Sequence, residues 1–496
     1  MDAVSSSFQH VRKFAEGSTW GSVITLLGLA AAVLAFVFQV QGAGEPPSLL
    51  DPIPFVFNTT QLLIANEKFM LRVSKILDSR NLAKFFLGFT PVYLVSGPKH
   101  IQTIFGRSHN FSNEKIFLEK VFPVLYWMPK KDVDRFTSDK SGRNKVPAPG
   151  TEDTPPENRV WAQYADVHTE YLSRTQHMKP IIEYFRGQLT SKLEKFPKGK
   201  WTEVGIIDLC RHDVTECAIS ALFGPKVFEL NEGFLDAFWQ YDENIFTLVL
   251  GLPEWVNPRP YRVRDRFLTM IDSYLRVAWK EFDWNGPDAD AYFEPHFGAR
   301  VSREIVRWLK DGGFHDRSQA GALGSLLFAQ NSNSIPTTMW VIMEVLADPE
   351  LLQAVREEIN ALAFVTDPDT SERVIDAQKI ATLPLLQSVF NEVLRMHMNF
   401  NIMRNLTDSV TMDGYTLRKG ATIQAPMLVA HYDEAVWAKE GRPASQFWAD
   451  RHIKYKDQTD EFGKVSRERT FAMAGRPSSY FPFGKILACP LQFICS

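Results

Sequence analysis

The chain has 496 residues, of which 45% are hydrophobic and 12% aromatic, and its formal net charge is −3. This composition excludes general disorder, because disordered chains lack the apolar side chains that a core needs. The near-neutral charge excludes a nucleic-acid-binding surface, which would need clustered lysine and arginine. The four cysteines have no metal-site or disulfide-framework spacing, which suits a reducing compartment.

The N-terminal region contains an apolar run at residues 20–40 without a charged side chain. It is long enough for the ~20 helical residues that span a bilayer. A cleaved signal peptide is the alternative, but its apolar part is usually only about 7 to 15 residues long and ends at a small-residue cleavage site. We therefore expect a tail at 1–19, a transmembrane anchor at 20–40, a helix-free Pro/Gly hinge at 41–55 and a folded body at 56–496.

The first part of the body shows alternating strand and helix patterns. Residues 92–95 read as a strand and residues 98–105 as a short helix. The polar stretch 130–158 predicts a long surface loop, and apolar residues at helical spacing follow from Trp161 onward. Gly321 and Gly324 are too weak a signal for a phosphate-binding loop.

Residues 326–350 predict a long apolar helix that is interrupted by a polar stretch before Pro336. The polar residues are Gln330, Asn331, Ser332, Asn333 and Ser334. Each unpaired buried polar group costs about 1 to 3 kcal/mol, so such groups usually face water, a cofactor or a ligand. A locally capped kink is the alternative. Asp348 and Pro349 then predict the N-cap and first residue of the next helix.

A Glu-x-x-Arg pair, Glu392 and Arg395, follows on an amphipathic helix, where the spacing i to i+3 places both side chains on one face. Alone, it is no more than a surface pair. Downstream come Arg404, a strand-like segment at 409–417 and the run Phe447-Trp-Ala-Asp-Arg451. The chain ends in Tyr480-Phe-Pro-Phe-Gly-Lys-Ile-Leu-Ala-Cys489-Pro.

In this order, the motifs resemble those of the cytochrome P-450 superfamily. The motif Asn-Ser-Ile-Pro-x-Thr-x-Trp is most similar to the corresponding motif in the branch of sterol 7α- and 12α-hydroxylases and prostacyclin synthase. The resemblance implies a mainly α fold with small β-sheets, a single large domain behind the transmembrane helix. It also implies haem b, iron protoporphyrin IX, with Cys489 as the axial iron ligand, because a thiolate favours O–O cleavage.

The resemblance assigns roles to particular residues. Phe483 and Gly484 belong to the ligand loop, and Arg404 reaches a haem propionate. Asn333 and Ser334 border the oxygen pocket, with Ser334 or Thr338 as the proton relay. Glu392, Arg395 and Arg451 form a buried network that holds the haem-side core. The second propionate clamp has no candidate, because Ala165 stands four residues after Trp161 where a base is expected.

The implied function is that of a monooxygenase that hydroxylates an apolar small molecule (a sterol, lipid or secondary metabolite) with O₂. Its electrons come from NADPH-cytochrome P450 reductase, and membrane lipid but no nucleic acid is a partner. The positive-inside rule would place the N-terminus in the cytosol; the resemblance instead implies a single-pass protein of the endoplasmic reticulum with a cytosolic catalytic domain. The sequons at Asn58, Asn110 and Asn405 should then stay unglycosylated.

Two other functions remain open. Asn333-Ser334 replaces the usual acid-Thr pair, which is compatible with an isomerase that rearranges a peroxide without a reductase. A haem-free or catalytically inactive truncated gene product is the other alternative.

The C-terminus departs from the family pattern Phe-Gly-x-Gly-x-x-x-Cys-x-Gly. The interval from Phe483 to Cys489 is one residue too short, the second glycine is missing, and seven residues follow Cys489, where family members continue with a helix and strands. Because Gly-Lys can be encoded by GGTAAG, a splice-donor sequence, we expect residues 485–496 to be translated intron and the domain to be incomplete. Cys489 is then either a coincidental cysteine or a genuine ligand in a degenerate loop.

Overall fold

The computed structural model describes Gly28 and residues 44–53, 55–106, 110–366, 371, 373–399, 401–459 and 465–482. The chain forms two compact units. The first comprises Met1–Ser112, Asn399–Asp433 and Pro477–Ser479, and the second Asn113–Met398, Glu434–Arg476 and Tyr480–Ser496. Among the described residues, no helix has both the length and the apolar character for a membrane crossing. The predicted anchor at 20–40 lies outside the described residues, except for Gly28.

The first unit is built on a five-stranded sheet with the order β1-β2-β11-β8-β3. The strands of this sheet are β1 (Leu82–Leu87), β2 (Thr90–Val95), β3 (Phe111–Ser112), β8 (Asn401–Leu406) and β11 (Thr422–Pro426). Strands β9 (Val410–Met412) and β10 (Tyr415–Leu417) form a separate antiparallel pair. Its helices are α3 (Phe57–Ile64), α4 (Asn66–Arg80), α5 (Pro98–Gly106) and α20 (Met427–His431). Strand β2 pairs antiparallel with β1 and parallel with β11. The strand and helix predicted at 92–95 and 98–105 are therefore confirmed.

The described part of the predicted hinge, residues 44–53, is held against this sheet. The carboxylate of Glu45 accepts Lys84 Nζ at 2.7 Å and lies 2.6 Å from Arg418 Nε. The backbone N–H of Leu49 donates to Lys84 O at 2.7 Å. The hydrogen bonding of the first unit thus begins upstream of the boundary expected at residue 56.

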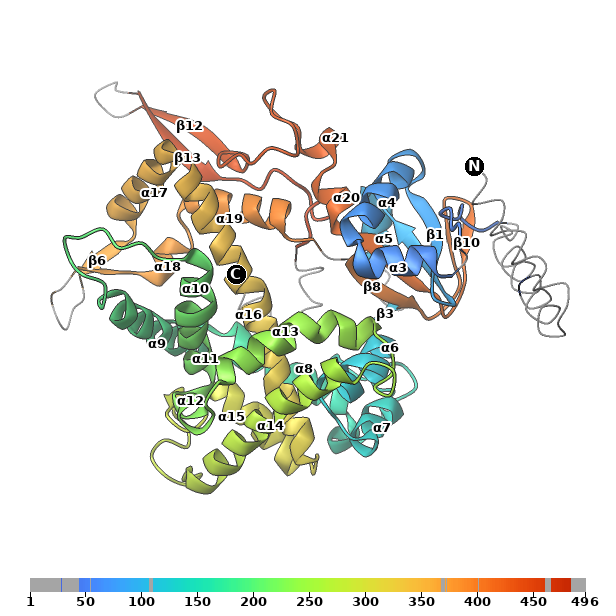
Figure 1. Ribbon diagram of the computed structural model, residues 1–496, viewed down its shortest axis with the longest axis horizontal. Coiled ribbons are helices and arrows are strands. Elements are labelled where there is room, and N and C mark those ends of the chain that lie inside the picture. The colour runs from blue at the N-terminus through green and yellow to red at the C-terminus, as the bar shows by residue number, and fades with distance from the viewer. Residues whose placement is uncertain are drawn as a thin grey trace, which may run out of the picture. The chain divides into compact units, whose positions relative to one another are not determined.

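The second unit is mainly helical (Figure 1). Its helical elements are α6 (Glu114–Ile116), η1 (Phe117–Leu125), α7 (Lys130–Ser138), η2 (Pro156–Asn158), α8 (Val160–Ser173), α9 (Thr175–Leu193), α10 (Ile206–Asp208), η3 (Leu209–Val214), α11 (Thr215–Phe223), α12 (Lys226–Leu230), α13 (Phe234–Leu250), α14 (Pro258–Glu281), α15 (Arg300–Asp311), α16 (Asp316–Ala347), α17 (Pro349–Leu362), α18 (Ala377–Ile380), α19 (Pro384–His397) and α21 (Glu434–Trp437). Three short antiparallel pairs complete it: β4 (Phe293–Glu294) with β5 (Gly298–Ala299), β6 (Phe364–Thr366) with β7 (Arg373–Ile375), and β12 (Ile453–Thr459) with β13 (Val465–Phe471). The predicted mainly α architecture with small sheets is confirmed.

The stretch 130–158 is not the continuous loop predicted from its polarity. Residues Lys130–Ser138 form α7, which buries Val133 and Phe136 on one face. The carboxylate of Asp132 accepts hydrogen bonds from the backbone N–H of His315 at 2.8 Å and from Ser318 Oγ at 2.6 Å. Two apolar residues at helical spacing are too few to stand out in a polar sequence, so the prediction missed this helix.

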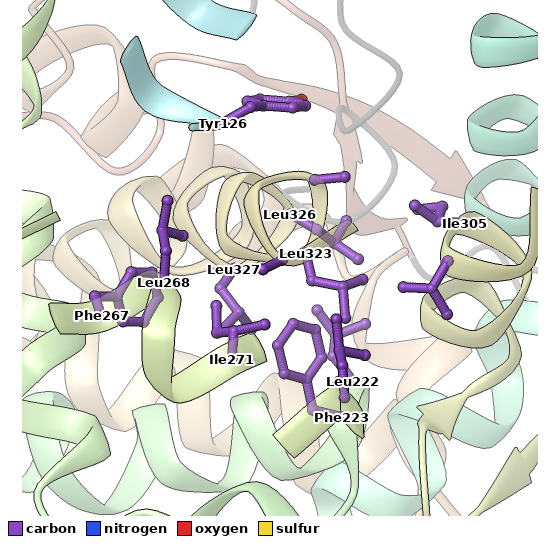
Figure 2. Packing of buried hydrophobic residues seen from close by; sticks show 14 of the residues in the cluster. Tyr126, Leu222, Phe223, Phe267, Leu268, Ile271, Ile305, Leu323, Leu326 and Leu327 are labelled. Atoms are coloured by element: carbon purple, nitrogen blue, oxygen red, sulfur yellow. The ribbon is translucent and has the colours of Figure 1, made fainter. Parts of the chain in front are cut away.

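Helix α16 forms the centre of the core of the second unit. Its Leu323 and Leu327 point towards side chains of α11 and α14, and Tyr126 lies on the opposite side of the helix (Figure 2). Gly321 and Gly324 permit this close packing. A Cβ at Gly321 would lie 1.7 Å from Tyr126 O, and one at Gly324 would lie 2.6 Å from Leu268 Cδ2. The glycine pair thus serves helix packing.

Candidate active site

The predicted polar stretch lies within α16, which continues through Pro336. Ser334 Oγ donates to Gln330 O, and Thr338 Oγ1 donates to Ser334 O at 2.9 Å. Both side chains are half-buried, whereas Asn333 is exposed. The two hydroxyls therefore bond to helix carbonyls around the proline, as expected for a locally capped turn, and neither bond prevents them from accepting a further donor.

Asn331 is the most deeply buried member of this polar stretch. Its side-chain amide donates to Leu327 O at 3.0 Å and to Gln330 Oε1 at 3.2 Å. Its Oδ1 is shielded from solvent and has no hydrogen-bond partner among the described residues. A buried unpaired acceptor is costly, so this turn of α16 is suited to a donor that the described residues do not supply.

Ser332 faces a different element. Its Oγ lies 2.5 Å from Oδ1 of Asp242, which belongs to α13. Sequence reasoning did not single out Asp242. The available signal was its place on the apolar face of α13, four residues after the buried Phe238 and three before the buried Ile245.

The Glu-x-x-Arg pair is fully buried, and the predicted network with Arg451 is present. Arg395 Nε and Nη2 each donate to Glu392 at 2.8 Å in a bidentate contact, and Arg451 Nε donates to Glu392 Oε1 at 2.8 Å. Arg451 also donates to the backbone carbonyls of Trp437 and Gln446. Burial alone would raise the pKa of Glu392, but Arg395, His452 and Arg451 lower it to about 2.

His452 lies beside this network as a neutral side chain, and its Nε2 has no hydrogen-bond partner among the described residues. The backbone N–H of Ala474 donates to its Nδ1 at 3.1 Å, so the ring proton sits on Nε2, which lies 3.6 Å from Glu392 Oε2. Burial lowers the pKa of His452. The sequence motif did not include this residue, although it directly follows Arg451.

The segment that enters the predicted cysteine loop is anchored on α19. Tyr480 Oη donates to Asn391 Oδ1 at 2.8 Å, and burial raises the pKa of this phenol. A Cβ at Gly475 would lie 2.3 Å from Trp437 Cη2, so this approach requires glycine. Phe483, Gly484 and Cys489 lie outside the described residues.

Helices α16 and α19 are joined by the tryptophan of the Asn-Ser-Ile-Pro-x-Thr-x-Trp motif. The Trp340 ring stacks on His397 of α19 with 3.7 Å between centroids. His397 Nε2 lies 2.9 Å from Glu344 Oε1 of α16. These contacts hold the helix of the polar stretch beside the helix of the Glu392 network.

Arg404, the predicted propionate ligand, is a half-buried residue of β8 in the first unit, where its Nη1 donates to Met403 O at 2.8 Å.

A second arginine, Arg143, was not predicted as a site residue. Its guanidinium carbon lies 4.3 Å from the Trp161 ring centroid and 5.0 Å from that of Phe117. Its shielded Nε and Nη2 have no hydrogen-bond partner among the described residues. Arg143 lies in the polar stretch 130–158, where sequence alone does not distinguish it.

Comparisons with known proteins agree on one family. The family model described as cytochrome P450 matches residues 160–484. The cytochrome P450 monooxygenase calL of Penicillium decumbens is 40% identical over 473 residues, which cover 94% of this chain and 86% of that protein. The cholesterol 7-alpha-monooxygenase of Cricetulus griseus is 27% identical over 321 residues, covering 59% of this chain and 57% of that protein.

Among solved structures, the retinoic acid bound cyanobacterial CYP120A1 is similar with a TM-score of 0.63 and 16% identity. The match covers 91% of this chain and 88% of that one. At this identity the likeness shows the fold alone, and it is the same fold that the buried Glu392 network and the order of the motifs indicate. The chain therefore belongs to the cytochrome P450 family of monooxygenases.

Proposed function

We propose that the chain inserts one oxygen atom of O₂ into an unactivated C–H bond of an apolar small molecule: a sterol, a lipid or a secondary metabolite. Electrons come from NADPH-cytochrome P450 reductase. The observation that carries the proposal is the fully buried network of Glu392, Arg395 and Arg451, in a chain of this family. Bound haem b would supply the thiolate-ligated iron at which O₂ is reduced. The polypeptide binds and orients the substrate, excludes water and handles protons.

The surroundings of Arg143 indicate whether the described residues could bind the propionates of a haem. A shielded guanidinium whose N–H groups lack an acceptor is costly, and haem b carries two propionate carboxylates that would pair with such a cation. Burial lowers the pKa of Arg143, and an arriving carboxylate would offset that effect. We therefore assign Arg143 as the propionate clamp in place of the base missing after Trp161. Arg404 is proposed for the other propionate on the resemblance alone.

Replacing Arg143 with alanine is expected to weaken haem retention by roughly tenfold to a hundredfold, because a hydrogen bond to a charged group contributes about 1.5 to 3 kcal/mol. The measurement is the rate of haem transfer to excess apomyoglobin. Arg317→Ala is the matched control, since Arg317 also stacks on an aromatic ring, with 4.2 Å to the Trp127 centroid, but is exposed. Equal haem loss from the two variants would remove Arg143 from the clamp.

Within α16, Asn333, Ser334 and Thr338 are proposed to border the oxygen pocket. The hydroxyls of Ser334 and Thr338 can rotate from their helix carbonyls to hold a water or pass on a proton. Cys489 is proposed as the residue whose thiolate would hold the haem iron, with Phe483 and Gly484 in the same loop.

A carbon monoxide difference spectrum of the full chain tests this proposal, together with substrate-dependent NADPH oxidation in the presence of the reductase. A thiolate-type Soret band and reductase-dependent oxygen insertion are the expected results. Turnover of a peroxide without the reductase would instead identify an isomerase. A chain that takes up no haem would be the inactive gene product, with Cys489 a coincidental cysteine.

For localisation, we propose that residues 20–40 anchor the chain in the endoplasmic reticulum membrane with the body in the cytosol. The native sequon at Asn58 is a poor reporter, because this side chain is fully buried and Arg72 Nη2 donates to its Oδ1. The substitution Lys200→Asn creates an Asn-x-Thr sequon with Trp201 and Thr202 in an exposed segment. We expect no mass shift on glycosidase treatment of this variant; a shift would place the body in the lumen.

A further inference from the structure

Helix α16 has no carboxylate of its own near its polar turn, since no Asp or Glu occurs between Asp316 and Glu344. The structure brings one there from α13. Ser332 Oγ of α16 donates to Asp242 Oδ1 of α13. Residues 242 and 332 are 90 positions apart in the chain, so only the packing of the two helices makes this pair.

The surroundings of Asp242 make its carboxyl group easier to protonate than an exposed one. No cation forms an ion pair with it among the described residues. Arg211 of η3, a cation whose charge acts on Asp242, is bound to Glu243 at 2.7 Å and stacks on Trp239 at 4.6 Å. Burial raises the pKa of Asp242, whereas the Ser332 hydrogen bond and Arg211 lower it and Glu243 raises it again; the net shift is upward.

We propose that Asp242 and Ser332 form a proton-holding pair that takes the place of the acid replaced by Asn333 in the polar turn of α16. This assignment rests on the proposed monooxygenase function, which needs protons at the oxygen pocket, and it extends that function to a residue outside the recognised motifs. The unpaired Oδ1 of Asn331, next in sequence to Ser332, marks the same turn as a place for a further hydrogen-bond donor such as water.

The proton transfer balances without a change of oxidation state. In the structure Ser332 Oγ donates to Asp242 Oδ1, so the transfer begins when the serine hydroxyl rotates towards a water molecule and the protonated carboxyl donates to Ser332 Oγ instead. The carboxyl O–H bond of Asp242 then breaks as its proton moves to Ser332 Oγ. In the same step the hydroxyl proton of Ser332 leaves to a water molecule, so the serine stays neutral. The Asp242 carboxylate then regains a proton from solvent. Asp242 is thus a positioning and proton-holding residue.

The first test needs no haem. Because the folded-state pKa of Asp242 is raised, the neutral carboxyl stabilises the fold relative to the ionised one. This contribution is present below the unfolded pKa of about 3.9 and is lost as the pH rises through the folded pKa. Asp242→Asn should therefore raise the Tm relative to the parent once the pH rises above about 4, and the difference should become constant above the folded-state pKa. Asp236→Asn, on an exposed position of the same helix, should show no such rise. A Tm difference for Asp242→Asn that is independent of pH would overturn the proposal.

The second test uses the holoenzyme with its reductase and measures hydrogen peroxide released per NADPH consumed. Asp242→Asn and Ser332→Ala should each raise this ratio severalfold and shift the pH profile of coupling, with haem content unchanged, and Asp242→Glu should restore much of the coupling. Unchanged coupling and an unchanged pH profile in Asp242→Asn would refute the proton-holding role. If the parent itself shows no turnover, the proposed function fails, whereas the Tm comparison still decides the state of the Asp242 carboxyl.

Discussion

Replacing Arg395 with lysine is expected to remove most of the folded, haem-bearing protein. Arg395 is fully buried and donates to both oxygens of Glu392, and the ammonium of lysine cannot reproduce this planar fork. A buried ion pair that loses one partner costs about 3 to 5 kcal/mol. That is a large fraction of a typical folding free energy of about 5 to 15 kcal/mol. Because the Glu392 carboxylate is also bound by Arg451, the substitution disturbs a junction between α19 and the segment after α21.

The matched control is Arg307→Lys in α15. Arg307 lies 3.7 Å from Asp311, its side chain is 52% exposed, and such surface pairs contribute only about 0.2 to 1 kcal/mol. The measurement is the yield of soluble haem protein together with urea unfolding at pH 7, where Glu392 is ionised because its pKa is about 2. Similar yields and midpoints for the two variants would show that the Glu392 pair contributes no more than a surface contact.

Replacing Gly321 with alanine is expected to destabilise the protein by roughly the upper end of the 1 to 3 kcal/mol typical of overpacked cores, or more. The added Cβ would lie 1.7 Å from Tyr126 O, a backbone atom that cannot rotate away as a side chain would. Helix α16 would have to separate from the segment after η1, and the packing around Leu323 would loosen.

Gly187→Ala is the matched control: the same substitution is expected to stabilise the protein at this position. Gly187 lies in α9, is exposed, and a Cβ there would meet nothing within 4 Å. Alanine at this position should stabilise the helix by about 0.5 to 1 kcal/mol, because glycine loses more backbone entropy on folding. Thermal unfolding of both variants checks the pair, and a Gly321→Ala protein that melts at or above the parent temperature would contradict the packing argument.

The sequence by itself determined the features that depend on neighbours along the chain. The strand at 92–95, the helix at 98–105 and the N-cap at Asp348 each follow from short-range patterns. Asp348 Oδ1 does accept the N–H groups of Glu350 and Leu351 at 3.0 and 3.1 Å. The spacing of Glu392 and Arg395 likewise predicted a shared face, because i to i+3 is a property of any helix. The family followed from the order of these motifs.

Tertiary structure alone decided which of these groups are buried and what they meet. The residues around Asp242 in the sequence do not predict its hydrogen bond with Ser332, and those around Arg143 do not predict its contact with the Trp161 ring. The short helix α7 was hidden for the same reason: its amphipathic face becomes visible only where another segment covers it. A polar side chain costs little in water and much in a core. The energetic cost of a polar side chain therefore depends on whether a segment distant in the sequence covers it and excludes water. The tertiary fold places that segment.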